Sequence, residues 1–126
     1  MTSPNIDTVI LQQYMHAFEH GDVALLAGLL RSDVEYEMPP IPTWFRGRDA
    51  VLDLHIRRVF TNAHYIIATS ANGFPAAASY SATAGGGFAA QGIHVLEIED
   101  SLIARVTLFL DKDLFPRFGL PLTVLD

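Results

Sequence analysis

The fold is decided at residues 35–48, which read Glu35-Tyr36-Glu37-Met38-Pro39-Pro40-Ile41-Pro42-Thr43-Trp44-Phe45-Arg46-Gly47-Arg48. A strand with alternating faces enters a proline-rich segment that carries the single tryptophan. Three prolines in four residues exclude a helix or a central strand there, so we expect a stiff extended loop that holds Trp44 in place. Trp44 is then either a lid over a pocket or a rim residue that seals the core.

Apolar residues recur at helical spacing on both sides of this stretch. Helices are expected over residues 5–20, 23–30 and 48–60. Asp22 stands where the N-cap of the second helix belongs, because its carboxylate can accept a hydrogen bond from a free backbone N–H. Before the proline-rich segment, Val34, Tyr36 and Met38 share one face of a strand, and two glutamates occupy the other face.

The rest of the chain is patterned as strands separated by turn residues. Asn72-Gly73 predicts a hairpin turn, and three consecutive glycines at 85–87 predict the next one. The expected strands cover residues 65–72, 76–83, 88–98 and 102–110, and a short helical turn is expected at 111–116. Helices followed by a run of strands indicate an α+β fold, here with four or five antiparallel strands curved around three helices. The open end of such a cone is the natural place for a ligand.

Composition restricts the function classes that this chain can belong to. Its 126 residues, 50% of them hydrophobic, suit a single domain over residues 1–126. The absence of cysteine excludes disulfides and thiolate nucleophiles and suits a reducing cytoplasm. A net charge of −6 disfavours nucleic-acid binding, and neither a secretory signal nor a membrane-spanning apolar run is visible. No histidine or carboxylate motif has metal-ligand spacing, so we expect no metal and no cofactor.

His94 is the strongest polar candidate for a site, because it lies in mid-strand on the same face as Leu96 and Ile98. A histidine that titrates near neutral pH transfers protons in either direction. The alternative is a core histidine that a single hydrogen bond satisfies. Tyr14 and His55 lie on apolar helix faces and have the same two interpretations.

Four further side chains are candidates, each with a structural alternative. Asp111 either acts in the site or caps the helical turn of the tail. Arg105 either binds an anion inside the cone or pairs with a surface carboxylate. Tyr36 and Tyr80 occupy positions that we expect to face the pocket, where a large aromatic serves as wall or as reagent.

Two longer motifs are specific enough to indicate a family. They are residues 37–48, quoted above, and residues 109–121, Phe-Leu-Asp-Lys-Asp-Leu-Phe-Pro-Arg-Phe-Gly-Leu-Pro. With the order of elements, they make nearly the whole chain resemble the SnoaL-like branch of the NTF2-like cone-shaped α+β barrels. That superfamily includes polyketide cyclases, ketosteroid isomerases and limonene-epoxide hydrolases. The motifs look most like the SnoaL-like C-terminal domain of some extracytoplasmic-function sigma factors. The sigma regions that bind DNA and polymerase are missing, so we interpret the chain as a free-standing relative, the alternative being an excised domain.

The resemblance implies roles for individual residues. Tyr14 matches an oxyanion-donating tyrosine of the isomerases, and His94 matches their second oxyanion donor. His55 matches a second tyrosine, and Asp111 matches an acid of the SnoaL-type cyclases. The general base of the isomerases corresponds to Met38, whose thioether cannot abstract a proton, so the standard ketosteroid isomerisation is not expected.

We therefore expect a small-molecule pocket protein of the SnoaL type that performs cofactor-free acid–base chemistry. The reaction would be a cyclisation, an isomerisation or a hydration/elimination of an apolar carbonyl-bearing substrate. His94 would transfer the proton, Tyr14 and His55 would stabilise charge on oxygen, and Asp111 would orient or relay. The expected substrate-binding residues are Tyr36, Met38, Trp44, Tyr80, Leu96, Arg105 and Phe109. The alternative is a non-catalytic ligand-binding or regulatory domain, which the sigma-factor resemblance and the missing base favour.

A second copy of the chain is the expected protein partner. The outward face of the sheet is expected to carry Ala77, Ser79, Ile93, Val95, Val106 and Leu108. Exposed apolar surface of that extent favours a partner, and related barrels usually dimerise through this face. We therefore expect a homodimer with C2 symmetry.

Overall fold

The computed structural model describes residues 6–125, so the predicted helix start at residue 5 lies outside them. Helix α1 (Ile6–His20) buries one apolar stripe. Helix α2 (Val23–Leu29) begins after Asp22, whose Oδ1 accepts a hydrogen bond from the backbone N–H of Leu25 at 3.0 Å, which confirms the predicted cap. Helix α3 (Arg48–Leu54) continues into one π-helical turn, η1 (His55–Val59), and together they cover the third predicted helix.

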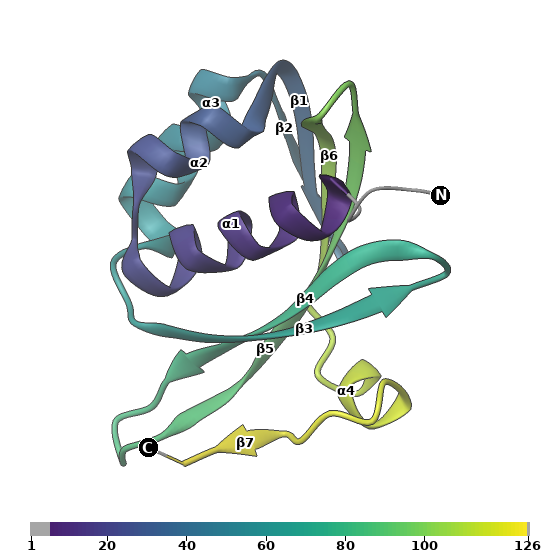
Figure 1. Cartoon of the computed structure of the whole chain (residues 1–126). Coiled ribbons are helices and arrows are strands. Elements are labelled where there is room, and N and C mark those ends of the chain that lie inside the picture. The colour runs from purple at the N-terminus through teal and green to yellow at the C-terminus, as the bar shows by residue number, and fades with distance from the viewer. Residues whose placement is uncertain (1–5, 126) are drawn as a thin grey trace.

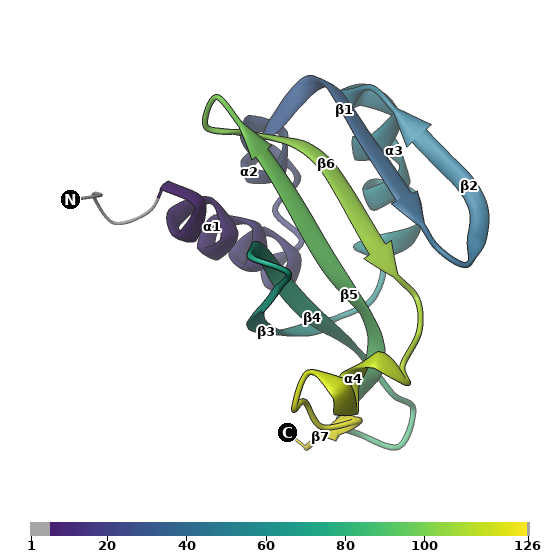
Figure 2. The same ribbon diagram turned by 90° about the vertical axis from the view of Figure 1, so that its right-hand side faces the viewer.

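The strands form one curved, open sheet in the order β2-β1-β6-β5-β4-β3 (Figures 1 and 2). Its members are β1 (Leu30–Met38), β2 (Ile41–Arg46), β3 (His64–Ala71), β4 (Phe74–Ala82), β5 (Phe88–Glu99) and β6 (Leu102–Phe109), with β7 (Thr123–Val124) paired to β5. A short helix, α4 (Leu114–Arg117), follows β6. The predicted α+β class is confirmed.

Three features of the sheet differ from the prediction. Residues 41–46 form strand β2 instead of a loop, and because β2 lies at the sheet edge and pairs only with β1, it tolerates Pro42. Strands β1 and β6 run parallel, whereas the prediction was antiparallel throughout. Strand β7 was not expected, and with β2 it brings the sheet to seven strands.

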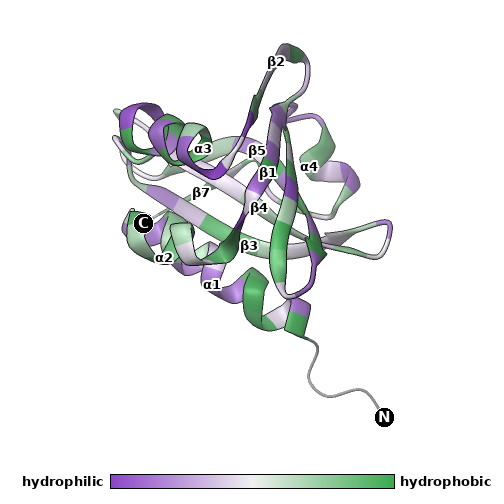
Figure 3. Ribbon diagram, turned by 90° about the horizontal axis from the view of Figure 1, so that it is seen from above, coloured by the Kyte–Doolittle hydropathy of each residue, from purple (hydrophilic) through white to green (hydrophobic). Residues whose placement is uncertain are grey.

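The two faces of the sheet are covered by different segments (Figure 1). Helices α1, α2 and α3 pack on the inner face, where the larger apolar cluster includes Tyr14, Phe18, Tyr36 and Leu96. Helix α4 and the C-terminal segment lie over the outer face, where a smaller cluster joins Tyr80 and Phe115 to neighbouring side chains. Along α1 to α3, hydrophobic residues alternate with hydrophilic ones, as expected of helices that bury one side (Figure 3).

Covering both faces explains why the predicted outward residues were partly wrong. Ala77 contributes to the inner cluster, and Ser79 bonds to His94, so neither faces outward. Val106 and Leu108 also belong to the inner cluster. Ile93 does face outward but is fully buried in the outer cluster. Strand β4 has no solvated face over residues 76–80, because Ala76 and Ala78 are inaccessible on one face and Ala77 and Ser79 on the other, so its serine does not mark the outside of the sheet.

Candidate functional site

The inner face holds a chain of hydrogen bonds that links helix α1 to strands β4 and β5. The Tyr14 hydroxyl lies 2.7 Å from Nδ1 of His94, and Nε2 of His94 lies 2.9 Å from Oγ of Ser79. Ser79 donates its only hydroxyl proton to Gln91 Oε1 at 3.0 Å or to the Gly92 carbonyl at 3.3 Å. It therefore accepts from His94, which places the proton of the neutral ring on Nε2 and leaves Nδ1 to accept from Tyr14.

Three buried polar atoms near this chain have no partner among the described residues: Nε2 of His55, the Tyr36 hydroxyl and Nδ1 of His64. His55 Nδ1 lies 2.7 Å from the Val51 carbonyl and must donate to it, which leaves Nε2 as an unpaired acceptor. The Tyr36 hydroxyl is also unpaired, and the Tyr36 and His55 ring centroids are 5.2 Å apart. The Phe18 ring packs edge-on against both His55 and His94. We call Tyr14, Tyr36, His55, Ser79 and His94 the buried polar cluster.

Burial keeps this cluster neutral. It lowers the pKa of His94 to about 3, with smaller contributions from His55 and His64, and it lowers the pKa of His55 to about 4. The pKa of Tyr14 is raised well above its ordinary value, mainly by burial and to a smaller extent by the neighbouring Tyr36 hydroxyl. The Tyr14 and Tyr36 hydroxyls are close, but they do not form a hydrogen bond. An efficient proton-transfer group has a pKa near the working pH, so a buried His94 is a poor base at neutral pH.

The other predicted site residues do not join His94 in one cavity. Met38 is half-buried against the inner core, and Leu96 is fully buried within it. Tyr80 belongs to the outer cluster, where its hydroxyl donates to the Pro121 carbonyl at 2.8 Å. Trp44, expected to line the same cavity as His94, is 57% exposed and lines a small hollow beside Arg105 on the outer face. That part of the site prediction is contradicted.

Arg105 and Asp111 also lie away from the buried polar cluster. Arg105 donates to Glu35 at 2.6 Å and to Glu37 at 2.9 Å, which is the surface pairing given as one of its two alternatives. Asp111 is exposed, and its Oδ1 accepts from the backbone N–H of Asp113 at 3.0 Å. This is an Asx turn ahead of α4, so Asp111 does not orient or relay to His94.

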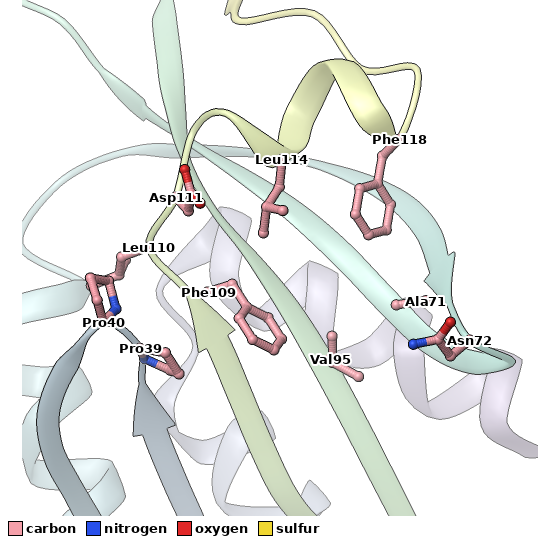
Figure 4. A pocket seen from close by; sticks show the side chains of 10 residues that line it. All are labelled: Pro39, Pro40, Ala71, Asn72, Val95, Phe109, Leu110, Asp111, Leu114 and Phe118. Carbon is pink, nitrogen blue, oxygen red and sulfur yellow. The ribbon is translucent and has the colours of Figure 1, made fainter.

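A cavity of about 530 Å³ lies on the outer face, between α4 and the sheet (Figure 4). Its lining residues are Pro39, Pro40, Ala71, Asn72, Val95, Phe109, Leu110, Asp111, Leu114 and Phe118. The lining is apolar except for Asn72 and Asp111. Its volume lies within the range of about 300–1,000 Å³ that is typical of small-molecule pockets.

Three chain segments meet at this outer cavity. The turn between β1 and β2 is tied to the tail, because the backbone N–H of Leu110 donates to the Pro39 carbonyl at 2.8 Å. The turn between β3 and β4 supplies Ala71 and Asn72, and Val95 and Phe109 form the floor of the cavity on β5 and β6 (Figure 4). Of the lining residues, the sequence analysis had assigned only Phe109 and Asp111 to a site. The apolar tail after Asp111 was a usable signal for Leu114 and Phe118.

Two classes of site are unsupported in the part of the chain that the structure describes. Among residues 6–125, no three histidine, cysteine or carboxylate side chains lie close enough together to hold a metal ion. None of the described helices is long and apolar enough to span a membrane.

Comparison with known proteins places this geometry in context. Residues 11–106 match the model of the SnoaL-like domain. The ECF RNA polymerase sigma factor SigG of Mycobacterium tuberculosis is 36% identical over 115 residues, which are 89% of this chain and 31% of that protein. The chain therefore spans less than a third of the curated relative that it matches.

Solved structures share the fold. One is a protein from Kribbella flavida that is provisionally described as a ketosteroid isomerase; it is 27% identical, with a TM-score of 0.66 over 84% of this chain and 78% of that one. Another is an NTF2-like protein of unknown function from Burkholderia xenovorans, which is 12% identical, with a TM-score of 0.70 over 84% of this chain and 83% of that one.

Proposed function

Because the chain belongs to the SnoaL-like domain family, we propose that it binds a small apolar molecule in the outer cavity and does not convert it. This proposal depends on one observation: the cavity lies apart from the buried titratable side chains. The cavity is lined by apolar side chains with Asn72 and Asp111, whereas His94 and His55 are fully buried on the other face of the sheet. An enzyme of the acid–base type needs two titratable groups that converge on a bound substrate.

A regulatory role would explain why a domain binds a small molecule without converting it. SigG, a sigma factor of RNA polymerase, contains a related segment, and this chain is similar to that segment alone. A ligand that binds one conformation of such a domain changes the surface it offers to other proteins. A regulator of this kind would work in the cytoplasm, beside the polymerase.

Filling the cavity tests the binding proposal. Nile red, a neutral apolar dye whose fluorescence rises in apolar surroundings, serves as the probe. Val95→Phe should abolish the fluorescence increase, because Val95 forms the cavity floor and is half-buried. Thr107→Phe is the matched control, since Thr107 is the register partner of Val95 on β6 and does not line the cavity. Equal binding by both variants would refute the assignment.

Acid–base catalysis on the inner face is the second candidate. The Tyr14–His94–Ser79 chain and the unpaired Tyr36 and Nε2 of His55 favour it, because such groups can hold a carbonyl oxygen. Catalysis at this site requires the inner core to open so that a substrate can enter. The test measures turnover of an apolar β,γ-unsaturated ketone. If His94→Gln lowers that turnover by about 10²–10⁴ and variants of the outer cavity leave it unchanged, catalysis on the inner face is favoured over the first candidate.

We also propose a homodimer that forms through the outer face beside Trp44. Trp44 of β2 is 57% exposed, and α4 leaves this end of the sheet uncovered. Opposite charges on neighbouring strands, such as Arg105 between Glu35 and Glu37, offer a polar rim for such an interface.

A further inference from the structure

A second hollow lies next to the outer cavity. This hollow, of about 420 Å³, is lined by Thr69, Ser70, Ala71, Asn72, Arg117 and Phe118. Ala71, Asn72 and Phe118 line both spaces, so the two are adjacent. We call the combined space the tail trough, because the C-terminal segment forms one of its walls.

The two ends of the tail trough differ in charge. At one end the Arg117 guanidinium is exposed and forms no ion pair within residues 6–125, and Thr69 and Ser70 line the same hollow. At the other end stands the Asp111 carboxylate, on the far side of the cavity from Asn72 (Figure 4).

The middle of the trough offers no polar group from the sheet. Val95 and Phe109 form its floor, and Leu114 and Phe118 of the tail point into it (Figure 4). Apolar surface buried there contributes about 25 cal/mol per Å², so an extended hydrocarbon body is the natural occupant of this middle section.

We propose that the tail trough binds an elongated apolar monocarboxylic acid, with its carboxylate at Arg117 and its hydrocarbon body over Phe109. This inference rests on the proposed ligand-binding function and names its ligand class. A guanidinium presents several N–H donors in a fixed plane, which matches the two oxygens of a carboxylate. Asp111 repels a second carboxylate at the far end, so dicarboxylic acids are selected against.

Calorimetric titration with three matched ligands tests the ligand class. The probes are decanoate, 1-decanol and decanedioate, each below its micelle concentration. We expect decanoate to bind about two- to five-fold more tightly than 1-decanol, because an exposed charged pair adds a modest, salt-screened increment. Decanedioate should bind more weakly than decanoate.

Three variants locate the effect. Arg117→Gln should bring decanoate to parity with 1-decanol, and Asp111→Asn should strengthen decanedioate binding alone. Arg58→Gln is the control, because Arg58 is also exposed and lies on η1, across the sheet from the trough. Like Arg117→Gln, the Arg58→Gln variant removes one positive charge, but it should leave the preference for decanoate over 1-decanol unchanged.

The failures of the two proposals are distinguishable. If 1-decanol and decanoate bind equally to the unaltered protein, or if Arg58→Gln weakens decanoate as much as Arg117→Gln, the ligand class is wrong and the binding function stands. If neither binds and Nile red also fails to respond, the cavity is not a ligand site and both proposals fall.

Discussion

At His94 the fold neutralises a side chain whose unperturbed pKa lies near 6.5. Both ring nitrogens are hydrogen-bonded, to Tyr14 and to Ser79, and the ring is inaccessible to solvent. The sequence predicted that His94 faces the interior, because it alternates with apolar neighbours on β5. It could not predict that Ser79 would occupy the other nitrogen, since that contact depends on the register of β4 against β5.

Replacing His94 tests its structural role. His94→Gln should lower the free energy of unfolding by about 1–3 kcal/mol, because glutamine cannot satisfy both Tyr14 and Ser79 from the same position. Urea denaturation measures the loss, and Nile red binding should stay unchanged. A variant of unaltered stability would contradict this role. His20→Gln, on the exposed end of α1, is the control and should change stability little.

At the scale of elements, the sequence predicted best where one face of an element is solvated. Helix α1 and the inner-facing residues of β1 were predicted well because polar residues mark their outer sides. Strand β4 could not be oriented, because both of its faces are buried. Strand β2 was missed because Pro42 within it, and Pro39 and Pro40 before it, mask a strand that needs only one hydrogen-bonded side.

The start of α2 provides an element-scale prediction. Asp22→Ala should destabilise the protein by about 1 kcal/mol, because the backbone N–H of Leu25 loses its side-chain acceptor. Asp22→Asn, which keeps an acceptor oxygen, should recover most of that loss. Thermal unfolding followed by circular dichroism measures both. Equal destabilisation by the two substitutions would mean that the charge of Asp22, and not its capping bond, is what matters.

The whole molecule should lose stability in mild acid because it buries neutral histidines. Burial lowers the pKa of His55 to about 4 and of His94 to about 3, and it lowers that of His64 as well. Below about pH 6.5 the unfolded chain takes up protons that the folded chain refuses, so stability falls with pH by up to about 1.4 kcal/mol per unit for each histidine. The urea midpoint should drop between pH 6.5 and 5, above the range in which carboxylates titrate. His55→Leu should flatten this dependence, and an unchanged slope would contradict the assignment.

The assembly of two chains is the remaining prediction at this scale. The sequence predicted a dimer from apolar residues of the sheet, but most of these residues are buried inside the protein. The proposal therefore depends on the end of the outer face that α4 leaves uncovered. Trp44 lies there in register with Glu37, and the residue is 57% exposed. Light scattering at micromolar concentration should give twice the chain mass of 13.8 kDa. Trp44→Glu should shift the protein to monomer, since it adds a like charge beside Glu37 and removes the largest exposed apolar side chain of β2.

A substitution of similar exposure elsewhere separates this interface from a general effect of charge. Ile56→Glu alters a side chain that is 54% exposed on η1, on the opposite side of the sheet, and should leave the dimer intact. If both variants are monomeric, added charge alone disperses the protein. If the unaltered protein is already monomeric, the Trp44 surface is available to a different partner, and the outer cavity must act within a single chain. Because Trp44 does not line that cavity, Nile red binding by Trp44→Glu should match that of the unaltered protein in either case.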